Sequence, residues 1–133
     1  FKVTYKPNWG KSTSTVAQVE RARQEGVDVT IDQYPYVASS TTLSTTLPSW
    51  ALSGGLDSLR SRLNNSALRA RIKKEMLQSL HKKLLKNYSY AVVARYAPDS
   101  SYNGKNISEV NLMKGRKQGA AQEAETILDL VSS

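Results

Sequence analysis

The stretch that decides the predicted fold is residues 12–36, which read STSTVAQVERARQEGVDVTIDQYPY. Between Ser12 and Glu25, apolar side chains recur at helical spacing, and Gly26 follows where a left-handed helix end is favoured. Residues 27–36 then alternate apolar and polar side chains, many of them β-branched, which is typical of a strand. These patterns predict a helix followed directly by a strand.

Residues 1–5, FKVTY, alternate in the same way and predict a second strand before the helix. Two strands joined by one helix are usually parallel, and the carboxyl ends of such strands form the working edge of the sheet. The hydroxyl-rich run after residue 33, QYPYVASSTTLSTTLPSW, lies at this predicted edge. Flexible linkers seldom carry Tyr-Pro-Tyr or Trp50, so we interpret this run as an ordered loop of a site.

The run YKPNWGKST at residues 5–13 looks like a phosphate-binding loop between a strand and a helix. Tyr5 stands where that loop needs a glycine, Pro7 has no N–H group, and Trp9 is bulky. We therefore exclude a nucleotide site. Residues 8–10 are instead expected to form a turn, with Ser12 as the helix cap.

The chain after residue 55 is predicted to be mostly helical, with helices over 56–63, 66–86, 107–115 and 120–131. The longest carries an apolar stripe every four residues, formed by Leu68, Ile72, Met76, Leu80 and Leu84. Between the helices, YSYAVVARY at residues 88–96 alternates and predicts a strand. The second part of the chain is thus expected to be α+β and rich in helix.

The formal charge of +8 raises the question of an anionic partner. Much of the excess lies in residues 69–86, and such a run is typical of a solvated helix face, so we do not expect nucleic acid to bind. The single histidine, His81, has no cysteine or second histidine at ligand spacing, which indicates a surface residue and no metal site.

At 133 residues the chain has the length of one domain, and it is too short for a (β/α)8 barrel of about 250 residues. It has no apolar run of the roughly 20 residues that a membrane helix needs. The sequence does not begin with methionine and shows no signal-peptide pattern, so we expect a cut N-terminus, and the localisation stays unknown.

Three runs together resemble one family: KxxxxxNWGKS at residues 2–12, DQYPYVASST at 32–41 and ISEVNLMKGRKQGAAQEAETILDLV at 107–131. They are similar to the N-acyl-D-amino-acid deacylases, or D-aminoacylases, of the amidohydrolase superfamily. The resemblance implies an α/β internal fragment of a zinc-dependent enzyme. Its parts would be one β-α-β unit of an incomplete (β/α)8 barrel at 1–42, an α+β insertion subdomain at 43–106 and barrel-side helices at 107–133.

The same resemblance implies that the fragment holds substrate and supplies neither catalytic residues nor metal ligands. Lys2 would offer a cation to the carboxylate of an N-acyl-D-amino acid, Tyr34 a phenolic donor to the carboxylate or the scissile carbonyl, and Ser40 a further carboxylate donor. We expect the isolated fragment to be inactive, to bind no zinc and to self-associate. The alternatives left open are a basic nucleic-acid-binding module and a purely structural interaction module.

Overall fold

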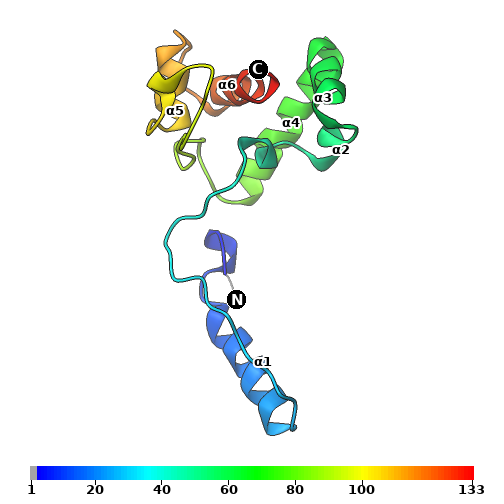
Figure 1. Cartoon of the computed structure of the whole chain (residues 1–133), viewed down its shortest axis with the longest axis vertical. Helices are drawn as coiled ribbons and strands as arrows, with labels where there is room; N and C mark the ends of the chain where they lie inside the picture. Colours follow the sequence, from blue (N-terminus) through cyan, green and yellow to red (C-terminus); the bar gives the residue numbers. More distant parts are fainter. Residues whose placement is uncertain (1–2) are drawn as a thin grey trace. The chain divides into compact units, whose positions relative to one another are not determined.

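The computed structural model describes residues 3–133, and Phe1 and Lys2 lie outside the described residues. Two compact units make up the chain, residues 1–40 and residues 41–133. In Figure 1 the first unit runs from blue to cyan, and the second continues through green and yellow to red. Each unit has its own local architecture.

The first unit contains one short 3-10 helix, η1 (Lys6–Asn8), and one α-helix, α1 (Ser12–Gln24). The predicted helix and its glycine stop are confirmed. Gly26 has a φ of +83°, the amide of Val27 donates to the carbonyl of Ala22, and the amide of Gly26 donates to that of Arg23. This is the Schellman arrangement, which satisfies carbonyls at a helix end and reverses the chain.

After this reversal the chain runs extended through residues 27–40, back beside α1 (Figure 1). The Arg23 side chain ties the two together, because its Nε donates to the carbonyl oxygen of Val29 over 2.9 Å. Apolar side chains of this segment stay open, with Val27 51% and Ile31 42% exposed. Residues 3–40 include no buried residue, so the described part of this unit has no core.

The predicted α/β fold class is therefore wrong. Residues 3–133 contain no strand and no sheet, so neither a β-α-β unit of a barrel nor a strand-bearing insertion is present. An alternating segment becomes a strand only when a neighbouring strand completes its ladder of hydrogen bonds. Residues 27–36 have the extended backbone that the pattern indicates, but they lie beside a helix. The predicted strand 1–5 includes Phe1 and Lys2, which lie outside the described residues, and residues 3–5 form no strand.

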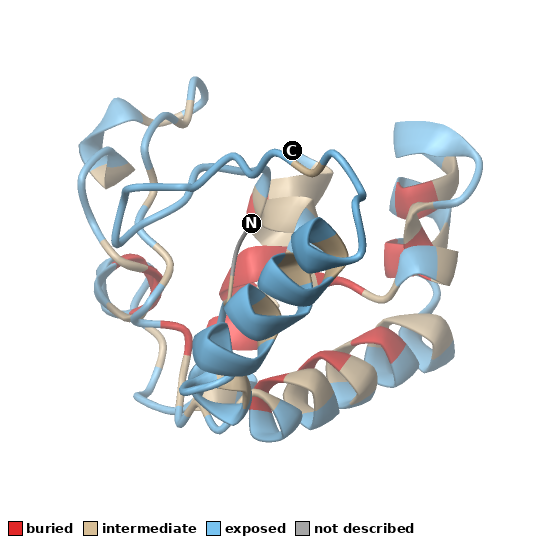
Figure 2. Ribbon diagram, turned by 90° about the horizontal axis from the view of Figure 1, so that it is seen from below, coloured by how far each residue is buried: buried red, intermediate tan, exposed pale blue. Residues whose placement is uncertain are grey.

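The second unit is a bundle of helices. In chain order they are η2 (Leu43–Thr46), α2 (Ser49–Leu52), α3 (Gly55–Asn64), α4 (Ser66–Lys82), η3 (Ser100–Tyr102), α5 (Ile107–Met113) and α6 (Ala120–Ser132). Helix α6 packs against α3, α4 and α5 and lies at the centre of the bundle. Figure 2 shows the consequence, with buried residues gathered on the inward sides of these helices. The domain boundaries expected from the sequence, 1–42, 43–106 and 107–133, stay a prediction.

Part of the core consists of apolar residues that helical spacing predicted. Ile72, Met76 and Leu80 of α4 are buried, and so are Ile127 and Leu128 of α6. At about 1.5–3 kcal/mol for each fully buried aliphatic side chain, such residues dominate the stability of this unit. The capping box of α5 adds to it, because Asn106 and Glu109 each accept the backbone amide of the other.

The predicted strand at 88–96 is also wrong. It is reduced to one isolated antiparallel bridge between Val92 and Asn106. The pairing stops there because η3 occupies the turn and α5 starts at Ile107, which leaves no further partner backbone. Tyr88 and Val92, which a strand would place on one face, differ in burial, since Tyr88 is buried while Val92 is 61% exposed.

Helix α4 ends at Lys82, four residues before the predicted end. Leu84 has a φ of +55°, the left-handed region where a side chain is unfavourable. The amide of Leu85 donates to the carbonyl of Leu80, and that of Leu84 to the carbonyl of His81, so this helix closes as α1 does. Leu84, expected on the apolar stripe, is consequently 63% exposed.

Candidate functional site

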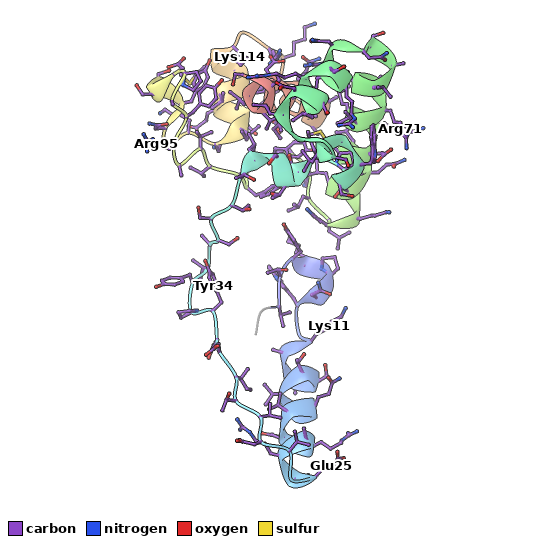
Figure 3. The ribbon with its side chains drawn as sticks, turned by 45° about the vertical axis from the view of Figure 1, so that its right-hand side comes forward. Lys11, Glu25, Tyr34, Arg71, Arg95 and Lys114 are labelled. Atoms are coloured by element: carbon purple, nitrogen blue, oxygen red, sulfur yellow. The ribbon has the colours of Figure 1, made fainter. Side chains whose placement is uncertain are left out.

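The predicted site lies on the extended segment of the first unit. Tyr34 is 41% exposed, and Figure 3 shows its side chain projecting away from α1. Ser40 is exposed as well, six residues further along, after a bend in the chain at Val37. Both residues therefore lie at the surface of the first unit. Lys2, the third predicted contact, lies outside the described residues.

The phenol ring of Tyr34 has a defined neighbour. Its centroid lies 5.3 Å from that of Tyr36, and the two ring planes are inclined by 72° in an edge-to-face arrangement. Pro35 between them fixes its own φ and disfavours helical backbone at Tyr34. This Tyr-Pro-Tyr element therefore presents two phenols from one short stretch of backbone.

The turn before α1 differs in part from its prediction. The Asn8 side chain donates to the carbonyl of Thr4 over 2.9 Å and accepts from Lys11 Nζ over 2.8 Å. These contacts close the turn, and Gly10 there has a φ of +85°. Ser12 is not the cap: Lys11 holds the N-cap position, without a side-chain cap hydrogen bond.

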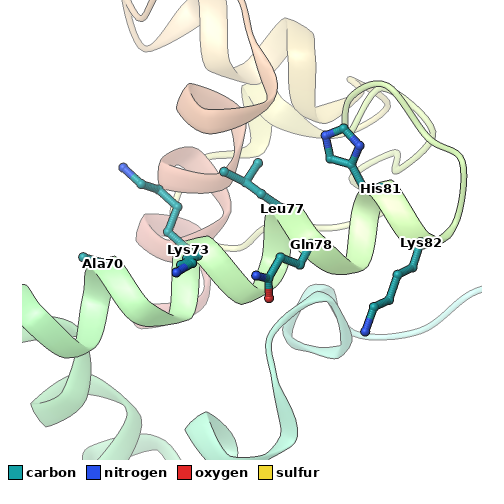
Figure 4. Close-up of a pocket in the computed structure, with 7 residues that line it drawn as sticks. Ala70, Lys73, Leu77, Gln78, His81 and Lys82 are labelled. Carbon is teal, nitrogen blue, oxygen red and sulfur yellow. The ribbon is translucent and has the colours of Figure 1, made fainter.

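The second unit has an open hollow along α4 (Figure 4). Its lining residues are Ala70, Lys73, Lys74, Leu77, Gln78, His81 and Lys82. The exposed position predicted for His81 is confirmed. All of these residues belong to one helix, so the hollow has no opposing wall that could orient a ligand.

Carboxylates of α6 pair with part of the positive charge beside this hollow. Lys73 Nζ lies 2.7 Å from Glu125 Oε1, and the Arg69 guanidinium lies 2.7 Å from Glu125 Oε2 and 2.8 Å from Asp129 Oδ1. Arg116 contacts the other oxygen of Asp129 over 2.6 Å. These cations serve the packing of α4 against α6 and do not form a free anion site.

The pKa values of the two carboxylates follow from this network. Burial acts to raise the pKa of Asp129, but hydrogen bonds from Arg116 and Arg69 outweigh it and leave the value lowered. Burial likewise opposes the shift at Glu125, where hydrogen bonds from Lys73 and Arg69 lower the pKa. Both side chains are held in their charged form.

Glu123 is a buried polar residue whose role the sequence did not reveal. It is 1% exposed, its Oε2 accepts the backbone amide of Tyr88 over 2.7 Å, and its Oε1 accepts the Ser108 hydroxyl over 2.8 Å. It also lines a shallow depression with Lys86 and Gln118. The carboxylate joins three segments of the second unit, and this is a structural role. The sequence signal that could have indicated this role is the position of a glutamate in the first turn of a mostly apolar helix.

Residues 3–133 contain no group of three or more His, Asp or Glu side chains placed to hold a metal ion. Within the same part of the chain, no helix combines the length and the apolar character that crossing a membrane requires. In the extended segment of the first unit, the hydroxyl-bearing residues Tyr34, Tyr36, Ser39 and Ser40 are all exposed.

Comparison with known proteins finds similarity in one stretch. A segment of 36 residues is 61% identical to the N-acyl-D-glutamate deacylase of Alcaligenes xylosoxydans xylosoxydans. The segment is 27% of this chain and 7% of that enzyme, so the chain matches a small part of the relative's length. No family model and no solved structure matches the chain. The similarity relates part of the chain to a deacylase, which is a hydrolase.

Proposed function

We propose that this chain is a segment of a larger amidohydrolase and that its residues 1–40 help to hold an N-acyl-D-amino acid. The 61% identity to an N-acyl-D-glutamate deacylase over 36 residues carries the proposal. In the proposed reaction, water adds to the amide carbonyl and the C–N bond breaks. The products are a carboxylic acid and a free D-amino acid.

The proposed contacts suit the carboxylate that every N-acyl amino acid carries. A carboxylate is held well by one cation together with several hydroxyl donors. Lys2 would supply the cation, and Tyr34 and Ser40 the hydroxyl donors. The exposure of Tyr34 and Ser40 on one segment supports this assignment.

The metal expected for the family does not fit the described residues. No cluster of suitable ligands occurs among residues 3–133, so zinc would be bound by other parts of the complete polypeptide. We therefore assign no step of bond cleavage to this chain. The chain alone is proposed to be inactive and to bind zinc only weakly.

The exposed apolar side chains of the first unit lead to a proposal about association. Val27, Ile31 and Val37 are open on a segment whose neighbours in the described structure do not cover them. Burying such exposed apolar side chains between two copies of the chain would be favourable. The isolated chain is proposed to form oligomers at micromolar concentration, and sedimentation velocity tests this. A single monomeric species up to 100 µM would contradict it.

The function is tested by one assay on two proteins, the 133-residue chain and the complete polypeptide, both with zinc and N-acetyl-D-glutamate. We expect release of D-glutamate by the complete polypeptide only, and much slower release from N-acetyl-L-glutamate. Zinc-dependent turnover by the chain alone would contradict the assigned role. Absence of any N-acyl-D-amino-acid hydrolysis by the complete polypeptide would contradict the function itself.

A further inference from the structure

We infer that Tyr36 is a positioning residue, whose ring fixes the orientation in which Tyr34 presents its hydroxyl to the substrate. The inference rests on the proposed function, because it concerns the same site. It adds a residue to which neither the resemblance nor the matched relative assigns a role. Its basis is the edge-to-face contact between the two rings, with centroids 5.3 Å apart and planes inclined by 72°.

The contact follows from local chemistry. Side chains two residues apart in an extended chain project to the same side of the backbone. Pro35 restricts its own φ and keeps Tyr34 out of the helical region, so little backbone freedom remains between the rings. The element needs no distant part of the chain to form, and it is therefore expected to persist in the complete polypeptide.

A tyrosine side chain can occupy several rotamers, which direct its hydroxyl differently. An aromatic neighbour in edge-to-face contact favours one of them, with an energy that corresponds to a two- to tenfold preference. Preorganisation of this kind lowers the entropy lost when the hydroxyl engages a carboxylate. Tyr36 is itself 71% exposed, so its ring serves no core of the unit.

The first experiment tests the ring contact in the 133-residue chain by NMR. The ring protons of the tyrosine whose edge meets the other ring are expected to shift upfield. The shift should disappear in Tyr36→Leu, persist in Tyr36→Phe and shrink in Pro35→Ala. Ring protons at random-coil positions in the unsubstituted chain would overturn the inference, and this result would not depend on whether the complete polypeptide is a deacylase.

The second experiment measures steady-state kinetics of the complete polypeptide with N-acetyl-D-glutamate. Tyr36→Leu should raise KM about two- to tenfold and leave kcat within twofold, and Tyr36→Phe should restore the original KM. In a Tyr34→Phe background, Tyr36→Leu should have no further effect, because its action passes through the Tyr34 hydroxyl.

The outcomes separate this inference from the function on which it rests. If Tyr34→Phe raises KM but Tyr36→Leu does not, the positioning role is overturned and the function stands. If neither variant changes KM, both the positioning role and the role of Tyr34 are overturned. An effect of Tyr36→Leu on kcat alone would indicate a change in the folded fraction and would also overturn the inference.

Discussion

The backbone amide of Tyr88 donates to Glu123 Oε2 over 2.7 Å inside the second unit, and the same carboxylate accepts the hydroxyl of Ser108. One buried side chain thereby attaches the segment after α4 and the start of α5 to α6. Because the residue is 1% exposed, removal of the carboxylate leaves the Tyr88 amide buried without its acceptor.

Glu123→Ala is expected to lower the free energy of unfolding by about 2–3 kcal/mol, because it leaves the Tyr88 amide buried and without its acceptor. Glu123→Gln keeps one acceptor oxygen and should cost roughly half as much. Urea unfolding followed by circular dichroism measures both. Gln122→Ala, at an exposed position of the same helix, is the matched control and should stay within about 0.5 kcal/mol of the unsubstituted chain. Equal effects of all three changes would refute this role.

Tyr88→Phe is expected to leave the unfolding free energy unchanged or to raise it by about 1 kcal/mol. The Tyr88 hydroxyl is buried and has no hydrogen-bond partner among the described residues, so its removal relieves a desolvation penalty. Burial raises the pKa of this phenol most, and the nearby Tyr90 and Glu123 raise it further, so the phenol stays protonated. A loss of more than 1 kcal/mol in the same urea experiment would show that the hydroxyl has a partner.

Leu84→Gly is expected to stabilise the chain by about 1 kcal/mol. Leu84 closes helix α4 with a φ of +55°, which costs a residue with a side chain about 1–2 kcal/mol and costs glycine almost nothing. Its side chain is 63% exposed, so little packing is lost. Gly26→Ala is the converse change at the end of α1, where φ is +83°, and it should reduce the helix content of the first unit. A decrease in the melting temperature of Leu84→Gly would contradict the assigned strain.

The carboxylates of Glu125 and Asp129 should make stability depend on pH. Their pKa values are lower in the folded chain than their ordinary values, so the stabilisation is present at neutral pH and is progressively lost as the pH falls below those ordinary values of about 4. Arg69→Gln removes a guanidinium that both carboxylates share and should flatten this dependence.

The control for the pH experiment is Arg60→Gln. Arg60 pairs with Asp57 at 3.7 Å on the surface, where an ion pair contributes little. Urea unfolding at pH 7 and at pH 3.5 compares the three proteins. Between pH 7 and pH 3.5, we expect the unfolding free energy of the Arg60 variant to fall by as much as that of the unsubstituted chain. The unfolding free energy of the Arg69 variant should fall by less. A pH dependence that is the same in all three would refute the role of the network.

The helices could be predicted from the sequence because helical spacing of apolar residues is a local signal. Helices α1, α3, α4, α5 and α6 were all expected, with ends that differ by a few residues. The strands were not formed because alternation specifies an extended backbone, and a sheet needs a partner that the pattern does not contain. The early end of α4 was missed because Leu84 occupies a conformation that a leucine seldom adopts.

The chemistry of the proposed site could be predicted from the sequence, but its geometry could not. Tyr34 and Ser40 were predicted by resemblance, and the structure leaves both exposed on one segment. The contact between Tyr34 and Tyr36 depends on side-chain rotamers, which the motif does not specify. The burial of Glu123 depends on how the segment after α4 folds onto α6. Its hydrogen bond to Tyr88 joins residues that lie 35 positions apart in the sequence, which a local pattern does not reveal.

The central claim is that residues of this chain hold the carboxylate of an N-acyl-D-amino acid, and the most direct test is the KM of the complete polypeptide for N-acetyl-D-glutamate. Tyr34→Phe and Ser40→Ala are each predicted to raise KM about tenfold, the cost of one lost hydrogen bond to a charged group. Ser39→Ala, which removes the neighbouring exposed hydroxyl, is predicted to leave KM within twofold. Unchanged KM values for both Tyr34→Phe and Ser40→Ala would contradict the claim.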